Sequence, residues 1–247
     1  MIRVTPAKEP EDFDEKVRVP GNAALRELIG ESPDRPRPGP KRKPVAQRVG
    51  DIPPKDLPPF WRQSLGELRS AYRGVCAYLG MKIHPATGAA TVDHFKPKSK
   101  YQHLAYEWLN FRLATQQVNT YKGEAQVLDP FEIESGWFVL DIGTFEVKAN
   151  PDLDDDLRSR IETTILHLRL NEDPTFIRAR EEYHDLYHGL KTDRSGVPRA
   201  PLPFDWLESE CPFVAYELER QGRLRKCAGT PDQGFSFSAR LALSSQR

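Results

Sequence analysis

Proline is unevenly distributed along this chain of 247 residues, and its distribution limits what the first quarter can fold into. Twelve of the 22 prolines precede residue 60, and several stand close together in the stretch SPDRPRPGPKRKP. Proline fixes φ and lacks a backbone donor, so this stretch cannot form a central strand or a helix interior. We therefore expect residues 1–56 to form a flexible, Pro-rich and basic arm with at most a short helix over 22–30. The arm either contacts the phosphates of a nucleic acid or is a solvated tether.

The apolar pattern after residue 57 predicts an α+β fold. A core over 57–125 is followed by a hairpin and a mainly helical region over 126–225, and then by a flexible tail over 226–247. Helices are expected over 58–74, 115–123, 152–171, 174–190 and 203–224. Extended segments are expected over 75–80, 90–95 and 110–114, with a hairpin over 136–149.

Composition argues against a membrane-spanning protein and against a secreted one. The chain has no run of about 18 apolar residues, which a membrane-spanning helix needs, and its first residues lack the apolar region of a signal peptide. Its three cysteines are far apart and odd in number, which argues against a disulfide framework. We expect a cytoplasmic protein with no membrane contact.

Positive charge is concentrated in one segment of a chain whose formal net charge is zero. Residues 61–123 carry nine basic and three acidic side chains. A basic segment in a neutral chain is typical of a nucleic-acid contact, although a solvated basic face explains the same charge. The candidates for nucleic-acid binding are Lys96, Lys98, Lys100, Arg112 and Lys122.

Polar residues between 93 and 122 are of the types that phosphodiester hydrolysis requires. The reaction needs a base that takes a proton from water and a cation that neutralises charge on the phosphate oxygens. Asp93 and His94 are neighbours on a predicted strand, so their side chains point to opposite faces. Asn119 and Lys122 share a helix face, where one offers a carbonyl oxygen to a hard cation and the other a charge to a phosphate. Asn110 lies between them and can orient the imidazole. Taken singly, His94 also fits a structural histidine and Asp93 a salt-bridge partner.

The segment VDHFKPKSKYQHLAYEWLNFRLATQQVNTYKG resembles the ββα-metal core of the HNH endonuclease family. The shared features are the Asp-His pair, a central Asn, a last Asn on a helix and a Lys three residues later. The resemblance implies that His94 is the catalytic base, that Asn110 holds the loop and His94, and that Asp93 and Asn119 bind Mg²⁺ or Mn²⁺. Asn119 stands where many members have histidine, as in the subset that typically uses Mg²⁺.

More of the chain, roughly 60–190, resembles the PtuB-like HNH proteins of Septu-type and retron-linked phage-defence systems. That resemblance implies a PtuA-like ATPase partner, which we expect to dock on the helical region. Many relatives also carry two cysteine pairs that bind a structural zinc. Here Cys76 is alone, with Leu79, Thr115 and Val118 at the other three positions. One cysteine cannot form a tetrahedral thiolate site, so we predict no structural zinc and inward packing of Leu79 and Val118.

Together these features predict a metal-dependent HNH endonuclease that cuts DNA as the nuclease effector of an anti-phage defence system. Two alternatives stay open. The chain is a catalytically silent nucleic-acid-binding or scaffold subunit, or it is an HNH nuclease that acts on RNA or in a restriction or mobile-element setting.

Overall fold

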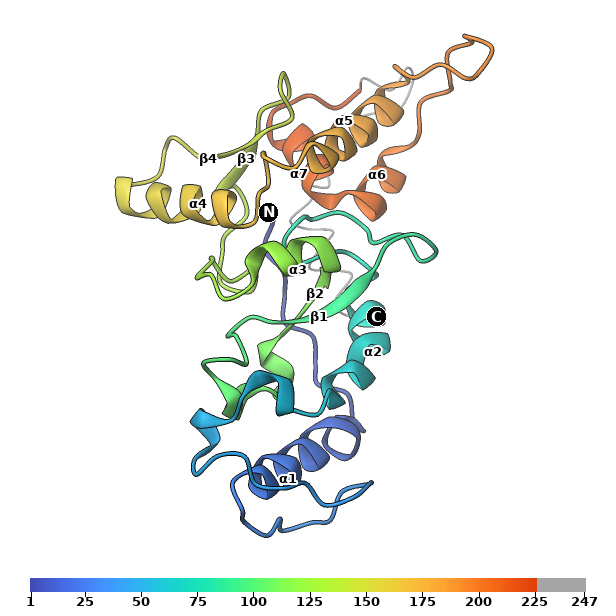
Figure 1. Cartoon of the computed structure of the whole chain (residues 1–247). Coiled ribbons are helices and arrows are strands. Elements are labelled where there is room, and N and C mark those ends of the chain that lie inside the picture. Colours follow the sequence, from blue (N-terminus) through green and yellow to red (C-terminus); the bar gives the residue numbers. More distant parts are fainter. Residues whose placement is uncertain (226–247) are drawn as a thin grey trace.

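Two separate antiparallel hairpins and the helices around them make up the fold of the computed structural model, which describes residues 1–225 (Figure 1). The strands are β1 (Ala90–His94), β2 (Phe111–Thr115), β3 (Phe138–Leu140) and β4 (Val147–Ala149), and the helices are α1 (Val19–Leu28), α2 (Leu65–Ala71), α3 (Gln116–Lys122), α4 (Asp155–His167), α5 (Pro174–His188), α6 (Phe204–Glu210) and α7 (Pro212–Arg220). The predicted α+β class is confirmed. The predicted flexible tail over 226–247 lies outside the described residues.

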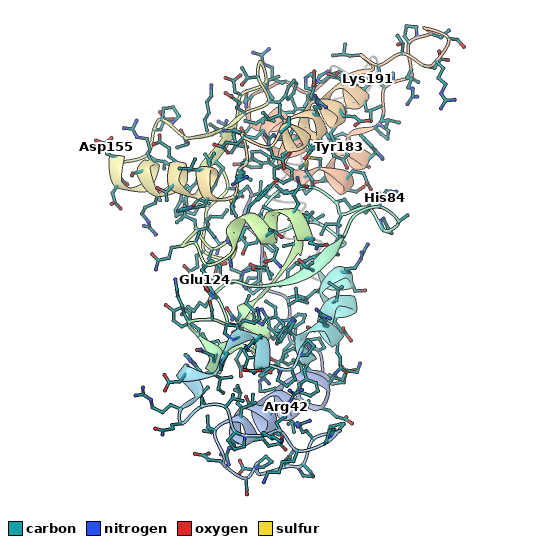
Figure 2. All side chains as sticks on the ribbon, in the orientation of Figure 1. Arg42, His84, Glu124, Asp155, Tyr183 and Lys191 are labelled. Atoms are coloured by element: carbon teal, nitrogen blue, oxygen red, sulfur yellow. The ribbon has the colours of Figure 1, made fainter. Side chains whose placement is uncertain are left out.

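The elements follow one another along the molecule. Helix α1 lies at one end, the β1–β2 hairpin with α2 and α3 lies in the middle, and α4 to α7 lie at the other end with the β3–β4 hairpin (Figure 1). Figure 2 labels Glu124, just after α3, and Asp155, the first residue of α4. Glu124 lies between the central hairpin and α4. Among residues 1–225, none of the helices combines the length and the apolar character needed to cross a bilayer.

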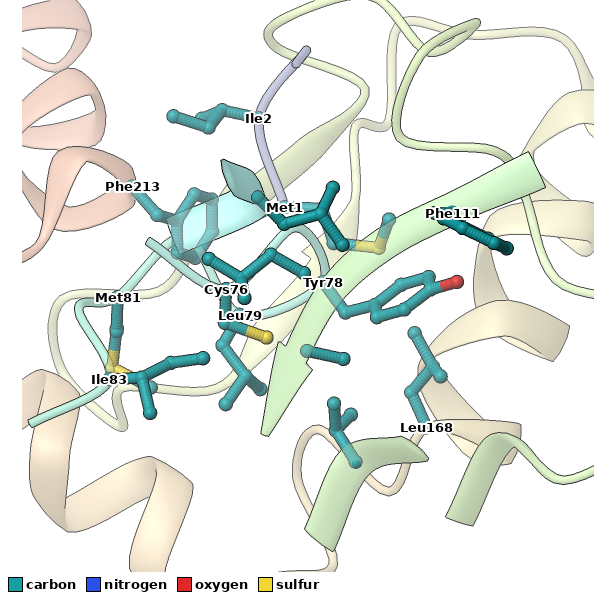
Figure 3. Close-up of a cluster of buried hydrophobic side chains, with 14 of the residues drawn as sticks. Met1, Ile2, Cys76, Tyr78, Leu79, Met81, Ile83, Phe111, Leu168 and Phe213 are labelled. Atoms are coloured by element: carbon teal, nitrogen blue, oxygen red, sulfur yellow. The ribbon is translucent and has the colours of Figure 1, made fainter. Parts of the chain in front are cut away.

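The N-terminal segment is part of the core, so the expectation of a disordered arm over 1–56 is wrong for its apolar part. Met1, Phe13 and Val17 are buried, and Figure 3 shows Met1 beside Cys76 in the central cluster. Pro20 lies at the start of α1, directly after a π-helical turn over Asp14–Arg18. The stretches over 1–10 and 31–48 contain no helix or strand, and Arg37 ties the second of them to the buried carboxylate of Glu27.

The central hairpin and α3 form where the apolar pattern predicts them. Strand β1 pairs antiparallel with β2, with Asp93 opposite Arg112 and His94 opposite Phe111. Helix α3 starts directly after β2, because the Thr115 side chain accepts a hydrogen bond from the Val118 N–H. It ends at Gly123, whose φ of +48° favours glycine. The chain therefore returns over the hairpin with no intervening loop.

The segment 75–80 is a tight turn, so the predicted strand there is wrong. A single bridge joins Val75 to Lys82, and Gly80 reverses the chain with a φ of +60°. A side chain at Gly80 would clash with Phe213, so the turn packs tightly against α7. The predicted burial of Leu79 and Val118 is confirmed, and Figure 3 shows Leu79 beside Cys76. The absence of zinc stays a prediction.

The remaining helices begin and end at the predicted signals. The Asp154 side chain caps α4, and α5 begins with Asp173 as its cap and Pro174 in its first turn. Gly189 ends α5 in a left-handed conformation. The last predicted helix, over 203–224, is two helices, α6 and α7, which meet at Cys211 and Pro212. Their buried faces complete the core above the central hairpin.

Candidate functional site

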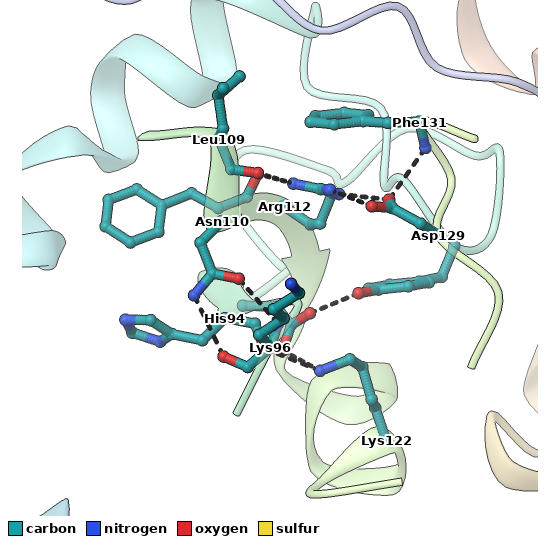
Figure 4. Close-up of polar contacts among 11 residues, drawn as sticks. His94, Lys96, Leu109, Asn110, Arg112, Lys122, Asp129 and Phe131 are labelled. Carbon is teal, nitrogen blue, oxygen red and sulfur yellow. Dashed lines mark hydrogen bonds and ion pairs between the residues drawn. The ribbon is translucent and has the colours of Figure 1, made fainter. Parts of the chain in front are cut away.

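The candidate site lies at the end of β1, where α3 crosses one face of the hairpin (Figure 4). On the other face, Trp61 and Phe111 pack against His94. Strand alternation places Thr91 and Asp93 on the face under α3. His94 points the other way. The two side chains thus have different surroundings, one charged and one aromatic.

Asp93 is buried and has partners on both carboxylate oxygens. The Lys122 ammonium lies 3.1 Å from Oδ1, and the Tyr78 hydroxyl donates to Oδ2. Lys122 also donates to the main-chain carbonyl of His94 at 2.9 Å. The Lys122 side chain has no exposed surface, because α3 and β1 enclose it. Burial, and next the charge of Asp93, raises the pKa of Tyr78 well above its usual value, so Tyr78 stays protonated and donates.

The His94 ring is held by one hydrogen bond and two aromatic contacts. Its Nε2 lies 2.9 Å from the Ala105 carbonyl oxygen, which only accepts, so Nε2 carries the proton and Nδ1 the lone pair. Trp61 and Phe111 pack edge-on, with ring centroids at 4.9 and 5.2 Å. Burial lowers the His94 pKa to about 4, and the nearby charges of Lys98 and Lys122 act in the same direction. The ring is therefore neutral at pH 7.

Asn110 joins the two ends of the loop between β1 and β2. Its side-chain oxygen accepts from the Lys96 N–H at 2.8 Å, and its amide donates to the carbonyls of Lys96 and Leu104 at 3.1 and 3.0 Å. Ala105, which holds His94, follows Leu104 directly. Asn110 therefore positions the His94 ring through the loop and does not touch it.

Two of the five candidates for nucleic-acid binding are unavailable for that role. Arg112 is buried, pairs with Asp129 through two nitrogens and lies over the Phe131 ring, 3.4 Å from its centroid. Lys122 is enclosed, as described above. Both predictions are wrong for the protein in this conformation, because each charge is neutralised inside the fold. Lys96 and Lys100 are exposed and Lys98 is half-buried on the loop, so these three remain available.

The predicted metal ligands do not meet in this conformation. The Asn119 amide donates to the Thr91 hydroxyl at 3.0 Å, one turn of α3 away from the Lys122 contact with Asp93. Carboxylate and amide oxygens suit a hard cation in kind. Lys122, however, already supplies the cation next to Asp93. Within residues 1–225, no group of three or more His, Cys, Asp or Glu side chains has the arrangement of a metal site.

Sequence reasoning missed Tyr78 and Trp61, which contact Asp93 and His94. Tyr78 lies in the turn that was expected to be a strand, and Trp61 lies in a 3-10 turn before α2. No spacing in the sequence connects either residue to the Asp-His pair, since both contacts form only when the chain folds.

Comparisons of this chain with protein-family models, with curated proteins and with solved structures found no match.

Proposed function

We propose that this chain is a metal-dependent endonuclease of the HNH type that hydrolyses phosphodiester bonds in DNA. The arrangement of β1, β2 and α3 supports the proposal, because it places Lys122 against the Asp93 carboxylate, with the His94 imidazole next along β1 on the opposite face. Asn110 orients the loop that holds the imidazole, and Asn119 lies on the same face of α3 as Lys122.

His94 is the proposed base. Its Nε2 proton is committed to the Ala105 carbonyl, so Nδ1 is the nitrogen that accepts a proton from water. A pKa of about 4 keeps the ring neutral and able to accept that proton across the neutral pH range. The same low pKa makes the imidazole a weak base, so the water it deprotonates must itself be unusually acidic.

A divalent cation supplies that acidity when bound, and it neutralises charge on the phosphate oxygens. Asp93 and Asn119 are the residues that would hold it, since both offer oxygen donors. The Lys122 ammonium must then leave Asp93, because both cations need the same carboxylate.

In the same proposal the chain is the nuclease effector of an anti-phage defence system. The helical region over 126–225 is not needed for the chemistry, so it is the expected docking surface for a partner ATPase. Lys96, Lys98 and Lys100 supply phosphate contacts, which give affinity without sequence preference.

A second candidate function is a nucleic-acid-binding subunit that does not cut. The buried contact between Lys122 and Asp93 favours it, because a protein cation in the metal position is compatible with a purely structural role. The Tyr78 hydrogen bond to the same carboxylate points in that direction too.

Cleavage assays separate the two. Wild type, His94→Gln and a control, His103→Gln, are incubated with plasmid, single-stranded DNA and single-stranded RNA in Mg²⁺, Mn²⁺ or EDTA. His103 is an exposed histidine of the same loop, so it controls for loss of an imidazole near the site. We expect metal-dependent cleavage of DNA that is lost in His94→Gln and kept in His103→Gln. Absence of metal-dependent cleavage on every substrate would leave the second function, and cleavage confined to RNA would correct the substrate.

A further inference from the structure

A cavity of about 530 Å³ lies next to the candidate site, between the loop after β1, the segment 125–128 and helix α4. Its volume is within the range of about 300–1,000 Å³ that small-molecule sites usually have. Phe95, which directly follows His94, forms part of its wall. The Lys122 ammonium lies 6.0 Å from the centroid of the Phe95 ring, so one aromatic side chain separates the cavity from the Asp93 site.

The lining of the cavity is positively charged. Lys96, Arg160 and His167 line it, and no carboxylate does. Within residues 1–225, neither Lys96 nor Arg160 forms a salt bridge, whereas Arg158, two residues earlier on α4, pairs with Asp155. Uncompensated basic groups facing a cavity favour an anionic ligand.

The cavity also has an aromatic surface. Tyr101 lines it, keeps 37% of its surface exposed, and has the Lys96 ammonium 5.7 Å from its ring centroid. A cation and an exposed ring on one loop are what a nucleotide needs, because the cation meets the phosphate and the ring stacks with the base.

We propose that this cavity binds one unpaired nucleotide of the substrate strand beside the bond that is cut. Its phosphate lies between Lys96 and Arg160, and its base stacks against Tyr101. A base pair within a double helix cannot enter a cavity of this size, so the nucleotide belongs to a single strand or is turned out of the duplex. The position next to His94 rests on the proposed function, whereas nucleotide binding itself does not.

Binding without catalysis tests the proposal. The fluorescence anisotropy of a labelled 12-nucleotide single strand and of the matching duplex is measured in EDTA with full-length Arg160→Gln and Arg158→Gln. Both variants remove one positive charge from α4, but only Arg160 lines the cavity. We expect Arg160→Gln to bind the single strand about five- to tenfold more weakly and to lower the salt slope of log K by about 0.7, the value for one phosphate contact. Arg158→Gln should change the affinity less than twofold.

A second pair of variants tests the cavity without changing its charge. Thr163 and Leu166 are both uncharged and exposed on α4, and only Thr163 lines the cavity. Thr163→Trp should fill the space and weaken single-strand binding, whereas Leu166→Trp should not. Equal effects of the two arginine variants, or of the two tryptophan variants, would overturn the proposal, as would duplex binding that is as tight as single-strand binding and as sensitive to Arg160→Gln.

The outcome is separable from that of the nuclease proposal. Weak binding by Arg160→Gln together with no cleavage by wild type would support the cavity and reject the nuclease. Cleavage by wild type together with unchanged binding by Arg160→Gln would reject the cavity and support the nuclease.

Discussion

The basic residues of the central segment divide into two groups with opposite surroundings. Arg112 and Lys122 are buried, and each meets a buried carboxylate, Asp129 from the loop after α3 for Arg112 and Asp93 of β1 for Lys122. Lys96, Lys98 and Lys100 project from the loop between the strands, and Lys100 meets only the exposed Glu124. Side chains of the same charge, close together in the sequence, therefore have two roles: the buried pair stabilises the fold, and the three loop lysines face solvent.

The difference shows what a charge count can and cannot indicate. A surplus of positive charge marks a segment, but the position of each residue in the strand or helix decides whether that charge reaches a ligand. Substitutions in the two groups should therefore have different effects. Replacing a buried basic residue should lower stability, and replacing a basic residue of the loop should weaken nucleic-acid binding.

Arg112→Gln should have the largest effect. It leaves the Asp129 carboxylate buried without its partner and removes the cation from above the Phe131 ring. Breaking a buried ion pair on one side costs about 3–5 kcal/mol, so urea unfolding should show a loss of that order. Adding Asp129→Asn should recover part of it. A loss below about 1 kcal/mol would mean that Arg112 is not enclosed in solution.

Lys122→Met should destabilise the protein by about 3 kcal/mol, since Asp93 keeps only Tyr78 as a partner. In this variant a divalent cation no longer competes with the ammonium. Added Mn²⁺ should therefore raise the Tm of Lys122→Met more than that of wild type, and it should not raise the Tm of Lys122→Met with Asp93→Asn. Equal shifts in all three proteins would show that Asp93 does not bind the ion.

The sequence predicts the local elements of the site well, since their signals are local. The alternation in ATVDHF, the cap at Thr115 and the stop at Gly123 define β1, β2 and α3 without distant contacts. Asn110 is found from its place in the sequence between the Asp-His pair and Asn119, and its side chain bonds to Lys96 and Leu104 of the loop, which is the role expected for it.

The burial of Arg112 and His94 is not predicted from the sequence, because it depends on partners that are distant along the chain. The carboxylate of Asp129 neutralises Arg112 from a loop after α3, and Trp61 covers His94 from the N-terminal side. The proline argument fails for a related reason: proline prevents strands and helix interiors, but it does not prevent extended chain with apolar side chains such as Met1 from packing against a core.

A smaller effect is expected from the pH dependence of His94. Its pKa is about 4 in the folded protein against 6.5 in an unfolded chain, because burial disfavours the charged ring. The unfolded state therefore binds more protons as pH falls below 6.5, so the contribution to stability is full above that pH and is lost towards pH 4. Between about pH 7.5 and 5, wild type should lose about 2 kcal/mol more of its unfolding free energy than His94→Gln. Equal losses by the two proteins would place His94 in solvent.

The smallest effect on stability should come from replacing Lys96, Lys98 and Lys100 together by Gln. These side chains neutralise no buried group, so the unfolding free energy should change by less than about 0.5 kcal/mol for each. Binding of a single-stranded oligonucleotide in EDTA should weaken at the same time, and the salt slope should fall by about 2 if all three contact phosphates. The matched control replaces the exposed Lys41, Lys43 and Lys55 of the N-terminal segment. An equal loss of binding in the control would mean that the proline-rich stretch also lies on phosphates, and that the loop is not a separate binding surface.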